Sequence, residues 1–580
     1  MKLTTQQRQA VKNPNHTLLV ACPGSGKTRA IVAKLLRCAD QVRDTPRRVA
    51  CITYTNAGVE EIDERLRAYG ASGDEDYCEV STIHTFCLNN ILRPFHWKFE
   101  AYKRGFSILP SDSEVYVQLA EETLTEEDLP QSALEDFENV NRAPDGTPIV
   151  SGGLTPAAAL TFWEKLSAQG YVDFANIVYL SFRLLADYPS IGHALACRFA
   201  SILVDEFQDT SALQVEILKI IAAQGRTRFF LVGDPFQSIY SFAGARPALM
   251  TEFADHIGAD SDFKLWDNFR SSTPIIAQSE RLLPRRPPMR AAGKEARHFV
   301  EVPEHVPCGS PFEGITDFFL PTVDALKIPY GRCAILAPSW FPLYRLGPRL
   351  REYKVPIYGV GARPYKRRHL FGLLAEPICA YIDSPSPDRI PAIEKGLFLM
   401  VAQATGDANF RVFSYESRVI IYRLLSAAKK LRTQFEAGID WMMAAAEEFE
   451  EILFAAGLFP KKCAGLFQQS VADIQHDMTT RGEDIANLTV TDLGLFANPT
   501  HNVKLLTIHQ AKGREFDAVA IIDLHDSRIP NWRNTTESAM DESKRQLYVA
   551  MTRARRILMY ITDSSHHRNI PSRFIATVLG

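Results

Sequence analysis

Paired cysteines are missing from this sequence. Its 10 cysteines include no Cys-x-x-Cys pair, the spacing typical of zinc ribbons, iron–sulfur sites and dithiol redox sites. The cysteines therefore predict neither a metal cluster nor a disulfide framework, and they fit a reducing cytoplasm. Residues 1–11 lack the apolar core of a signal peptide, and no uninterrupted apolar stretch is long enough to span a bilayer. We expect a cytoplasmic protein that does not contact a membrane.

A strong net charge is also missing. The chain has 65 Lys and Arg against 68 Asp and Glu, a formal net charge of -3. This balance excludes a generally basic nucleic-acid binder, so any such surface must be local. One candidate is RPYKRRH, residues 363–369, which fits a solvated loop and a phosphate-contacting patch equally well.

Two sets of short apolar runs alternate with amphipathic helical segments. The 580 residues exceed the size of one hydrophobic core, so we expect several domains. The expected strands are residues 17–21, 48–53, 202–204 and 228–234 in the first set, and 333–338, 503–508, 518–523 and 556–562 in the second. This alternation predicts an α/β fold with two parallel sheets, whose ligands bind beyond the carboxyl ends of the strands.

Each sheet is interrupted by an inserted, mainly helical stretch. The first insertion covers about residues 88–171 and the second about 366–499. The second contains WMMAAAEEFEEILFAAGLF, residues 441–459, whose Met and Phe content favours core packing over a partner-binding face. Proline and arginine crowd together in PRRPPMR, residues 284–290, where we expect a hinge.

A phosphate-binding loop is predicted at ACPGSGKT, residues 21–28. The stretch follows a strand and opens a helix, so its backbone N–H groups can cradle phosphate oxygens. Lys27 would reach the β- and γ-phosphates of a nucleotide, and the Thr28 hydroxyl would bind Mg²⁺. The remaining loop residues of the predicted site are Ala21, Cys22, Pro23, Gly24, Ser25 and Gly26.

Carboxylates follow the apolar run of ASILVDEFQDTS, residues 200–211. Charged groups at the mouth of a buried strand do not serve stability. We expect this strand to neighbour the strand of the phosphate loop. Asp205 would then bind Mg²⁺, and Glu206 would polarise the water that attacks the γ-phosphoryl group. A P-loop kinase or GTPase is a poor alternative, because it leaves the second sheet without a purpose.

Nine motifs occur in a fixed order along nearly the whole chain. They are LTTQQ (3–7), ACPGSGKTR (21–29), CITYTNAGVEEI (51–62), STIHTF (81–86), DEFQDT (205–210), VGDPFQSIYSFAGA (232–245), DNFRSS (267–272), VKLLTIHQAKGREFDAV (503–519) and QLYVAMTRAR (546–555). In this order the chain resembles UvrD/Rep-like superfamily 1 helicases. The resemblance implies two RecA-like domains, 1A at residues 1–87 and 172–272 and 2A at 273–365 and 500–580. The inserted subdomains would be 1B at 88–171 and 2B at 366–499.

The resemblance also implies roles in an ATP site. Gln7 resembles the glutamine that reads the adenine edge, and Arg29 and Phe269 resemble the pair that sandwiches the ring, where the family usually has Tyr in place of Phe269. Gln237 resembles the γ-phosphate sensor and Glu515 the ribose contact. Arg270 and Arg553 resemble the two arginines that clamp the γ-phosphate, a task that suits the guanidinium fork.

A single-stranded DNA path follows from the same resemblance. Bases would stack on Tyr240 and on Phe242, where the family usually has Trp, and Ala243 stands where it usually has Arg. The resemblance implies further contacts by the polar side chains of Thr53, Asn56, Thr82, His84, Thr507 and His509. His84 and His509 could instead be core histidines with satisfied hydrogen bonds.

The implied activity is ATP-driven movement on single-stranded DNA, 3′→5′ in direction, with duplex unwinding. An alternative is a DNA-sensing regulatory ATPase that unwinds little, as in the Gabija-type anti-phage helicase subunit, which works with an OLD-family nuclease. The PGSGKT form of the phosphate loop and the short segment after residue 555 are compatible with this alternative without being specific to it. A nuclease constellation is not evident in the sequence, so any cutting of DNA would fall to a separate protein.

Overall fold

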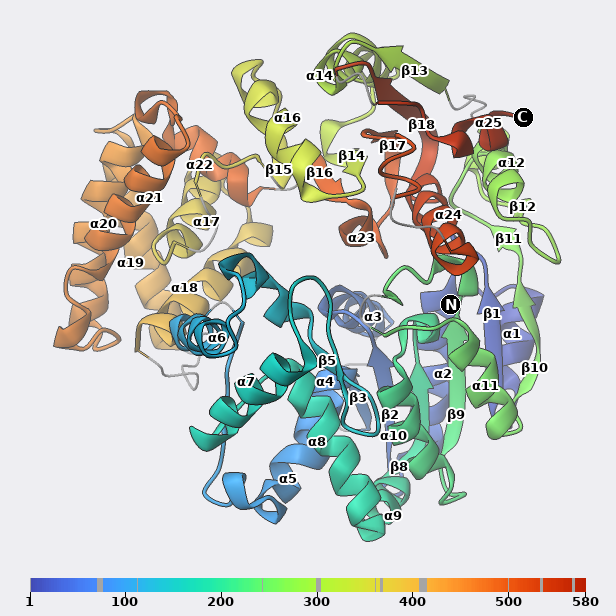
Figure 1. Cartoon of the computed structure of the whole chain (residues 1–580). Helices are drawn as coiled ribbons and strands as arrows, with labels where there is room; N and C mark the ends of the chain where they lie inside the picture. The colour runs from blue at the N-terminus through green and yellow to red at the C-terminus, as the bar shows by residue number, and fades with distance from the viewer. Residues whose placement is uncertain are drawn as a thin grey trace. The chain divides into compact units, whose positions relative to one another are not determined.

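The computed structural model describes residues 2–69, 77–111, 113–241, 244–298, 304–359, 361–365, 369–405, 415–498, 500–531, 536–565 and 569–580. The chain forms two compact units (Figure 1). Unit 1 comprises Met1–Val300 and Asn534–Thr552, and unit 2 comprises Glu301–Arg533 and Arg553–Gly580. Across these ranges no helix has the length and apolar character that a membrane crossing requires.

Unit 1 is built on a six-stranded sheet in which every neighbouring pair is parallel. The strand order is β10 (Asp260–Leu265), β1 (Thr17–Ala21), β9 (Arg228–Gly233), β8 (Phe199–Val204), β2 (Arg48–Thr53) and β3 (Cys78–Thr82). A parallel sheet places the carboxyl ends of all its strands at one edge. Segments that follow β10, β1, β9 and β8 therefore leave the sheet at neighbouring positions.

The two faces of this sheet are covered by separate hydrophobic cores. Alternate residues of β8 and β9 point to opposite faces: Ile202 and Phe229 join one core, and Leu203 and Phe230 join the other. Both sets are buried, which explains why the central strands read as continuous apolar runs. The covering helices are α1 (Thr5–Lys12), α2 (Lys27–Val42), α3 (Asn56–Ala68), α4 (Ile83–Cys87), α8 (Phe174–Asp187), α9 (Pro189–Arg198), α10 (Ala212–Ala222), α11 (Ala248–His256) and α12 (Thr273–Leu282).

Two further parts of unit 1 lie outside this layered body. Between β3 and α8 the chain forms a small helical region with its own core, which includes Tyr116, Phe137 and Phe162. Its longer helices are α6 (Glu114–Glu126) and α7 (Pro156–Ala168), beside the hairpin of β5 (Asn141–Arg142) and β6 (Pro148–Ile149). Helix α24 (Glu537–Met551) also belongs to unit 1, although it comes from far along the sequence.

Unit 2 contains a second six-stranded parallel sheet. Its order is β13 (Glu304–Cys308), β18 (Ala554–Asp563), β17 (Phe516–Ile521), β14 (Cys333–Ala337), β16 (Val503–Thr507) and β15 (Ile357–Gly359). Helices connected to this sheet include α15 (Leu320–Ala325), α16 (Trp340–Glu352), α23 (Ile508–Ala511) and α25 (Arg573–Leu579). The two sheets confirm the predicted α/β class with two RecA-like domains.

The second insertion is a helical bundle within unit 2. It comprises α17 (Gly372–Asp383), α18 (Ile390–Thr405), α19 (Tyr415–Arg432), α20 (Gly438–Ala455), α21 (Leu466–Thr480) and α22 (Val490–Ala497). Trp441, Met442 and Phe449 of α20 have no exposed surface and lie in the core that these helices share. The prediction that this amphipathic segment packs into a core is confirmed.

The segment expected to be a hinge, residues 284–290, lies within unit 1. Arg285 is only 8% exposed. Arg290 and Ala291 form strand β12, which pairs in parallel with Asp267 and Asn268 of strand β11. These contacts place the segment inside unit 1 rather than at the boundary of the two units.

We expect Trp441→Ala to loosen the helical bundle of unit 2. Truncation of a fully buried aromatic side chain typically costs about 3–5 kcal/mol, so hydrogen exchange in α20 and α21 should accelerate. Mass spectrometry of exchange on the whole chain measures the effect. The control is Trp97→Ala, because Trp97 is 51% exposed. Equal exchange in the two variants would contradict the assignment of Trp441 to the bundle core.

Candidate nucleotide site

Four neighbouring strands of unit 1 deliver polar residues to one edge of the sheet. The phosphate loop follows β1, Asp234 and Gln237 follow β9, Asp205 and Glu206 follow β8, and residues 268–270 follow β10. Strand β9 lies between β1 and β8. The expectation that Asp205 follows the strand next to the phosphate-loop strand is therefore wrong. The order of the sheet inserts the Asp234 segment between them.

The phosphate loop has the backbone that its glycines allow. Gly24 and Gly26 have φ values of +67° and +82°, a left-handed region that favours glycine. A Cβ on Gly24 would lie 2.6 Å from the Cβ of Arg270 and 2.8 Å from Oδ1 of Asn268. Only glycine at this position therefore lets the loop approach Asn268 and Arg270 this closely. Ser25 Oγ donates to the Cys22 carbonyl at 2.6 Å, and helix α2 begins at Lys27.

The side chain of Gln7 is hydrogen-bonded to the phosphate loop. Its Nε2 donates to the Ser25 carbonyl at 2.9 Å, and its Oε1 accepts from Thr4 N at 3.0 Å in a capping box at the start of α1. The side chain is 1% exposed. Gln7 thus fixes the loop, and its reading of adenine stays a prediction. The two residues expected to sandwich the adenine ring, Arg29 and Phe269, are both exposed.

Lys27 is paired with Glu206. Its Nζ lies 2.8 Å from Oε1 and 2.9 Å from Oε2. Burial alone would lower the pKa of Lys27, but Glu206, Asp205 and Asp234 outweigh burial and raise it, so the amine is a cation. Glu206 has φ +50°, a conformation that is costly outside glycine and concentrates at functional sites.

Asp205 is a buried neighbour of this pair. The carboxyl group is buried, and burial, reinforced by Glu206, raises its pKa to about 7 against the opposing effect of Lys27. Two adjacent carboxyl groups with one nearby lysine suit a divalent cation, since Mg²⁺ takes one or two protein carboxylates and completes its shell with phosphate oxygens and water. Within the described ranges no group of three or more His, Cys, Asp or Glu forms a self-sufficient metal site.

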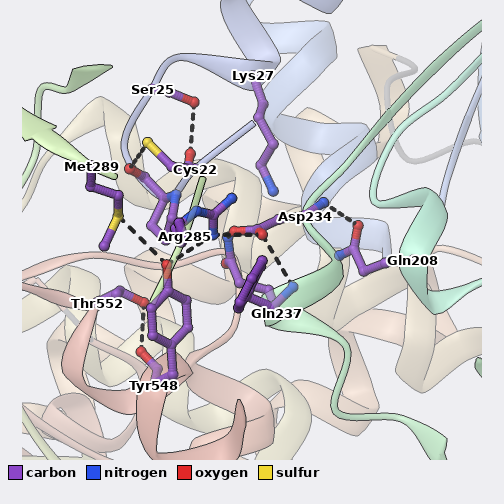
Figure 2. A network of polar contacts seen from close by, with 12 residues as sticks. Cys22, Ser25, Lys27, Gln208, Asp234, Gln237, Arg285, Met289, Tyr548 and Thr552 are labelled. Carbon is purple, nitrogen blue, oxygen red and sulfur yellow. Dashed lines mark hydrogen bonds and ion pairs between the residues drawn. The ribbon is translucent and has the colours of Figure 1, made fainter. Parts of the chain in front are cut away.

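Gln208 connects these carboxylates with strand β9. Its Nε2 donates to Oε2 of Glu206 at 2.6 Å, and its Oε1 accepts from Asp234 N at 2.8 Å. The side chain is completely buried. Figure 2 shows Gln208 reaching Asp234 from the side opposite Arg285. A shift of Glu206 would therefore disturb the end of β9 directly.

The Asp234 carboxylate has no exposed surface. Three groups donate hydrogen bonds to it, and one of them, Arg285, also neutralises its charge (Figure 2). Arg285 Nη1 donates to its Oδ1 at 2.8 Å, and Gln237 Nε2 donates to its Oδ2 at 2.6 Å. The backbone N–H of Phe236 donates to Oδ1 at 3.2 Å. Removing one partner of a buried ion pair leaves an uncompensated charge, so Asp234 and Arg285 depend on each other.

Arg285 also binds helix α24. The same Nη1 donates to the Tyr548 hydroxyl at 2.9 Å, and the guanidinium lies 4.5 Å from the ring centroid of Phe236. Burial raises the pKa of Tyr548 well above its ordinary value, so this hydroxyl keeps its proton and donates to Met289 Sδ at 3.5 Å. Arg285 therefore ties the end of β9 to α24.

Helix α24 sits on the segment after β9 along one of its faces. Glu542 accepts from the Ser241 hydroxyl, and Arg545 Nε donates to the Ser238 carbonyl at 2.8 Å. Residues 542, 545 and 548 recur every three positions and so share a face. At the end of the helix, Arg270 Nη1 donates to the Thr552 carbonyl at 3.0 Å. Thr552 immediately precedes Arg553 in the chain.

The predicted residues of unit 2 lie at its own sheet. Arg553 is 1% exposed, and its Nη1 donates to the Arg514 carbonyl at 3.3 Å. Glu515 is exposed and pairs with Arg555 at 3.0 Å. Thr507 caps helix α23 through a capping box with Gln510. His509 follows in that helix and is half-buried.

The residues of unit 1 that are predicted to contact DNA differ in how far they are buried. Thr53 is buried and donates to the Thr55 carbonyl at 2.8 Å, whereas Asn56 is exposed. Thr82 caps α4, and burial lowers the pKa of the half-buried His84. The Tyr240 ring lies 4.9 Å from that of Tyr54. Phe242 and Ala243 lie outside the described residues.

The basic segment 363–369 is only partly described. Arg363 is half-buried and pairs with Glu376, with Nε 2.7 Å from Oε1. Residues 366–368 lie outside the described ranges. In this structure the Arg363 guanidinium is engaged by Glu376 and by the Phe496 carbonyl, and the phosphate contact of this segment stays a prediction.

Sequence reasoning missed the roles of Asp234, Arg285 and Tyr548. A signal for Asp234 was present, since it directly follows a central strand as Asp205 does. No local signal marks Arg285 or Tyr548, because their partners are 51 and 263 residues away in the chain. The crowding of proline and arginine around Arg285 instead suggested a hinge.

Comparisons with known proteins identify the class that this fold and site define. The UvrD/REP helicase N-terminal domain model matches residues 3–258, and the UvrD-like helicase C-terminal domain model matches residues 469–565. The chain belongs to the UvrD-like family of ATP-dependent DNA helicases.

Individual relatives match over most of their own length. The ATP-dependent DNA helicase Rep of Escherichia coli is 25% identical over 99% of this chain and 94% of its own. DNA helicase II of Haemophilus influenzae is 25% identical over 99% of this chain and 86% of its own. The ATP-dependent DNA helicase PcrA of Staphylococcus aureus is 24% identical over 99% of this chain and 86% of its own.

We expect Arg285→Met to destabilise unit 1 more than Tyr548→Phe. The first change leaves the Asp234 carboxylate buried without its cation, which costs about 3–5 kcal/mol. The second removes one hydrogen bond to a charged group, worth about 1.5–3 kcal/mol. Urea denaturation measures both, with Arg226→Met as the exposed-arginine control. Equal midpoints for Arg285→Met and the control would refute the buried pair.

Proposed function

We propose that the chain is an ATP-driven motor that moves along single-stranded DNA in the 3′→5′ direction and separates duplexes. The convergence of Lys27, Glu206, Gln237 and Arg270 at one sheet edge carries the proposal. This edge joins a phosphate loop to a carboxylate pair and, through the Arg285 contact, to the helix that precedes Arg553. The names of the similar proteins, all ATP-dependent DNA helicases or DNA helicase II, support the same substrate class.

Lys27 would exchange partners when nucleotide binds. Its ammonium now lies between the two Glu206 oxygens, and the phosphate oxygens of ATP would compete for the same cation. Glu206, once released, could accept a proton from the attacking water. Asp205 and Thr28 would hold Mg²⁺, which when bound neutralises charge on the transferred phosphoryl group. Gln7, Arg29 and Phe269 would receive the base, and Glu515 the ribose.

Arg270 and Arg553 would act on the same γ-phosphate. The contact between Arg270 and the carbonyl of Thr552 supports this pairing, because it holds the residue just before Arg553. An arginine that reaches the γ-phosphate stabilises the charge of transfer and loses its contact after hydrolysis. Binding and release of ATP would thereby alternate between two arrangements of the RecA-like domains.

DNA would run across both RecA-like domains, with residues 88–171 and 366–499 as the 1B and 2B insertions. We propose contacts from Thr53, Asn56, Thr82, His84, Tyr240, Phe242, Thr507 and His509. The decisive experiment measures ATP hydrolysis with and without single-stranded DNA, then unwinding of 3′- and 5′-tailed duplexes. DNA-stimulated hydrolysis without unwinding would instead support a sensor ATPase of an anti-phage system, acting with an OLD-family nuclease.

We expect Lys27→Ala to reduce ATP hydrolysis by at least about 100-fold, because the γ-phosphate loses its main cation. A phosphate-release assay measures the rate, and thermal unfolding checks that the variant folds. Lys34→Ala is the control: Lys34 lies on the same helix and donates to the Asn13 carbonyl at 2.6 Å, away from Glu206. Full activity of Lys27→Ala would exclude the phosphate-loop assignment.

We expect Glu206→Gln to bind ATP while hydrolysing it about 100- to 10,000-fold more slowly, the usual contribution of a general base. Glutamine keeps the shape of the side chain and can still accept from Gln208 Nε2. Fluorescent-nucleotide titration measures binding, and single-turnover assays measure hydrolysis. Normal turnover in this variant would remove Glu206 from the reaction.

A further inference from the structure

Helix α16 of unit 2 exposes three aromatic rings in its first turns. Trp340, Phe341 and Tyr344 are 43%, 60% and 52% exposed. Contiguous apolar surface of this kind is uncommon on a protein without a partner and marks interaction sites. We call Trp340, Phe341 and Tyr344, together with Arg345, the α16 surface.

The rings share the outer side of the helix. At about 100° per residue, Trp340 and Tyr344 lie within roughly 40° of each other, and Phe341 and Arg345 follow at about 100° and 140° from Trp340. The opposite side of the helix carries Leu343, Leu346 and Leu350, which are at most 3% exposed. Packing against the sheet is therefore complete without the three rings.

The α16 surface is positively charged. Helix α16 contains three arginines and one acidic residue, Glu352, at its last position. Arg351 is paired with Glu483 at 2.6 Å, but Arg345 is exposed, with its guanidinium 5.7 Å from the Phe341 ring centroid. An aromatic surface beside a cation fits a ligand that has flat rings and negative charge.

The α16 surface also lies at the sheet edge where DNA contacts are proposed. Helix α16 follows β14, whose last residue Ala337 pairs with Thr507 of β16. Neighbouring strands are about 4.8 Å apart. Trp340 comes three residues after Ala337, and His509 comes two residues after Thr507. The two segments therefore leave one edge of one sheet at adjacent positions.

We propose that the α16 surface stacks unpaired bases of single-stranded DNA, with Arg345 on a neighbouring phosphate. Bases stack on aromatic rings without sequence preference, and a basic side chain follows the backbone. Paired bases are stacked on one another, so the occupant is a single strand. This inference rests on the proposed function and adds a binding surface to it.

The test compares Trp340→Ala/Tyr344→Ala with the wild-type chain in binding a fluorescent 20-nucleotide oligothymidylate. Each ring that carries a base contributes about 5- to 150-fold in affinity, so the double variant should bind at least about 10-fold more weakly. Trp340→Phe, which keeps a ring, should retain most of the affinity. Tyr422→Ala is the matched control, because Tyr422 is 73% exposed on α19 of the same unit.

A second arm separates stacking from charge. On an abasic oligonucleotide of the same length, the double variant and the wild-type chain should bind equally. Arg345→Ala should instead reduce the dependence of log affinity on log salt by about 0.7, the value for one lost phosphate contact on a single strand.

The failure of this inference differs from failure of the proposed function. If the wild-type chain neither binds the oligonucleotide nor hydrolyses ATP faster with it, the proposed function fails. If the wild-type chain binds and the double variant matches Tyr422→Ala, the α16 surface does not contact DNA and the inference is overturned. An equal loss on the abasic strand would overturn stacking as well. Circular dichroism confirms that each variant is folded.

Discussion

The Asp234 carboxylate is buried at the end of β9, where its charge must be neutralised within the protein. Arg285 supplies the cation, and Gln237 and the Phe236 backbone supply further hydrogen bonds. Because an uncompensated buried charge costs several kcal/mol, these groups cannot separate freely. The constraint holds the end of a sheet strand, the segment after α12 and, through Tyr548, helix α24 in one body. It explains why α24 belongs to unit 1 despite its distant place in the sequence.

The same constraint is the end of a series of contacts that begins at Lys27. From Lys27, contacts pass through Glu206 and Gln208 to Asp234, and then through Arg285 to Tyr548. Each step is a direct hydrogen bond or ion pair between buried or half-buried groups. A ligand that draws Lys27 away from Glu206 would change the first contact in this series. The last contact holds helix α24, so the series offers a physical route from Lys27 to this helix within unit 1.

Sequence patterns predicted the centre of each sheet and missed its edges. The eight expected strands correspond to β1, β2, β8 and β9 in unit 1 and to β14, β16, β17 and β18 in unit 2. The four missed strands, β3, β10, β13 and β15, are the edge strands of the two sheets. Central strands are buried on both faces and read as apolar runs, whereas β10, DSDFKL, has four of its six residues exposed. The phosphate loop was predictable because its contacts are local; the Asp234–Arg285–Tyr548 contacts were not, because they join distant segments.

The two predicted Thr-Ile-His segments show what a motif can and cannot specify. After β3 and after β16 the threonine caps the following helix, the isoleucine is buried and the histidine is half-buried. In both places the threonine hydroxyl accepts from the backbone N–H three residues on, so loss of Thr82 or Thr507 removes a helix cap worth about 1 kcal/mol. A threonine variant therefore reports on folding as well as on DNA. The histidines are the second residues of these helices, so their substitution leaves both threonine caps in place and tests a strand contact without the loss of a cap.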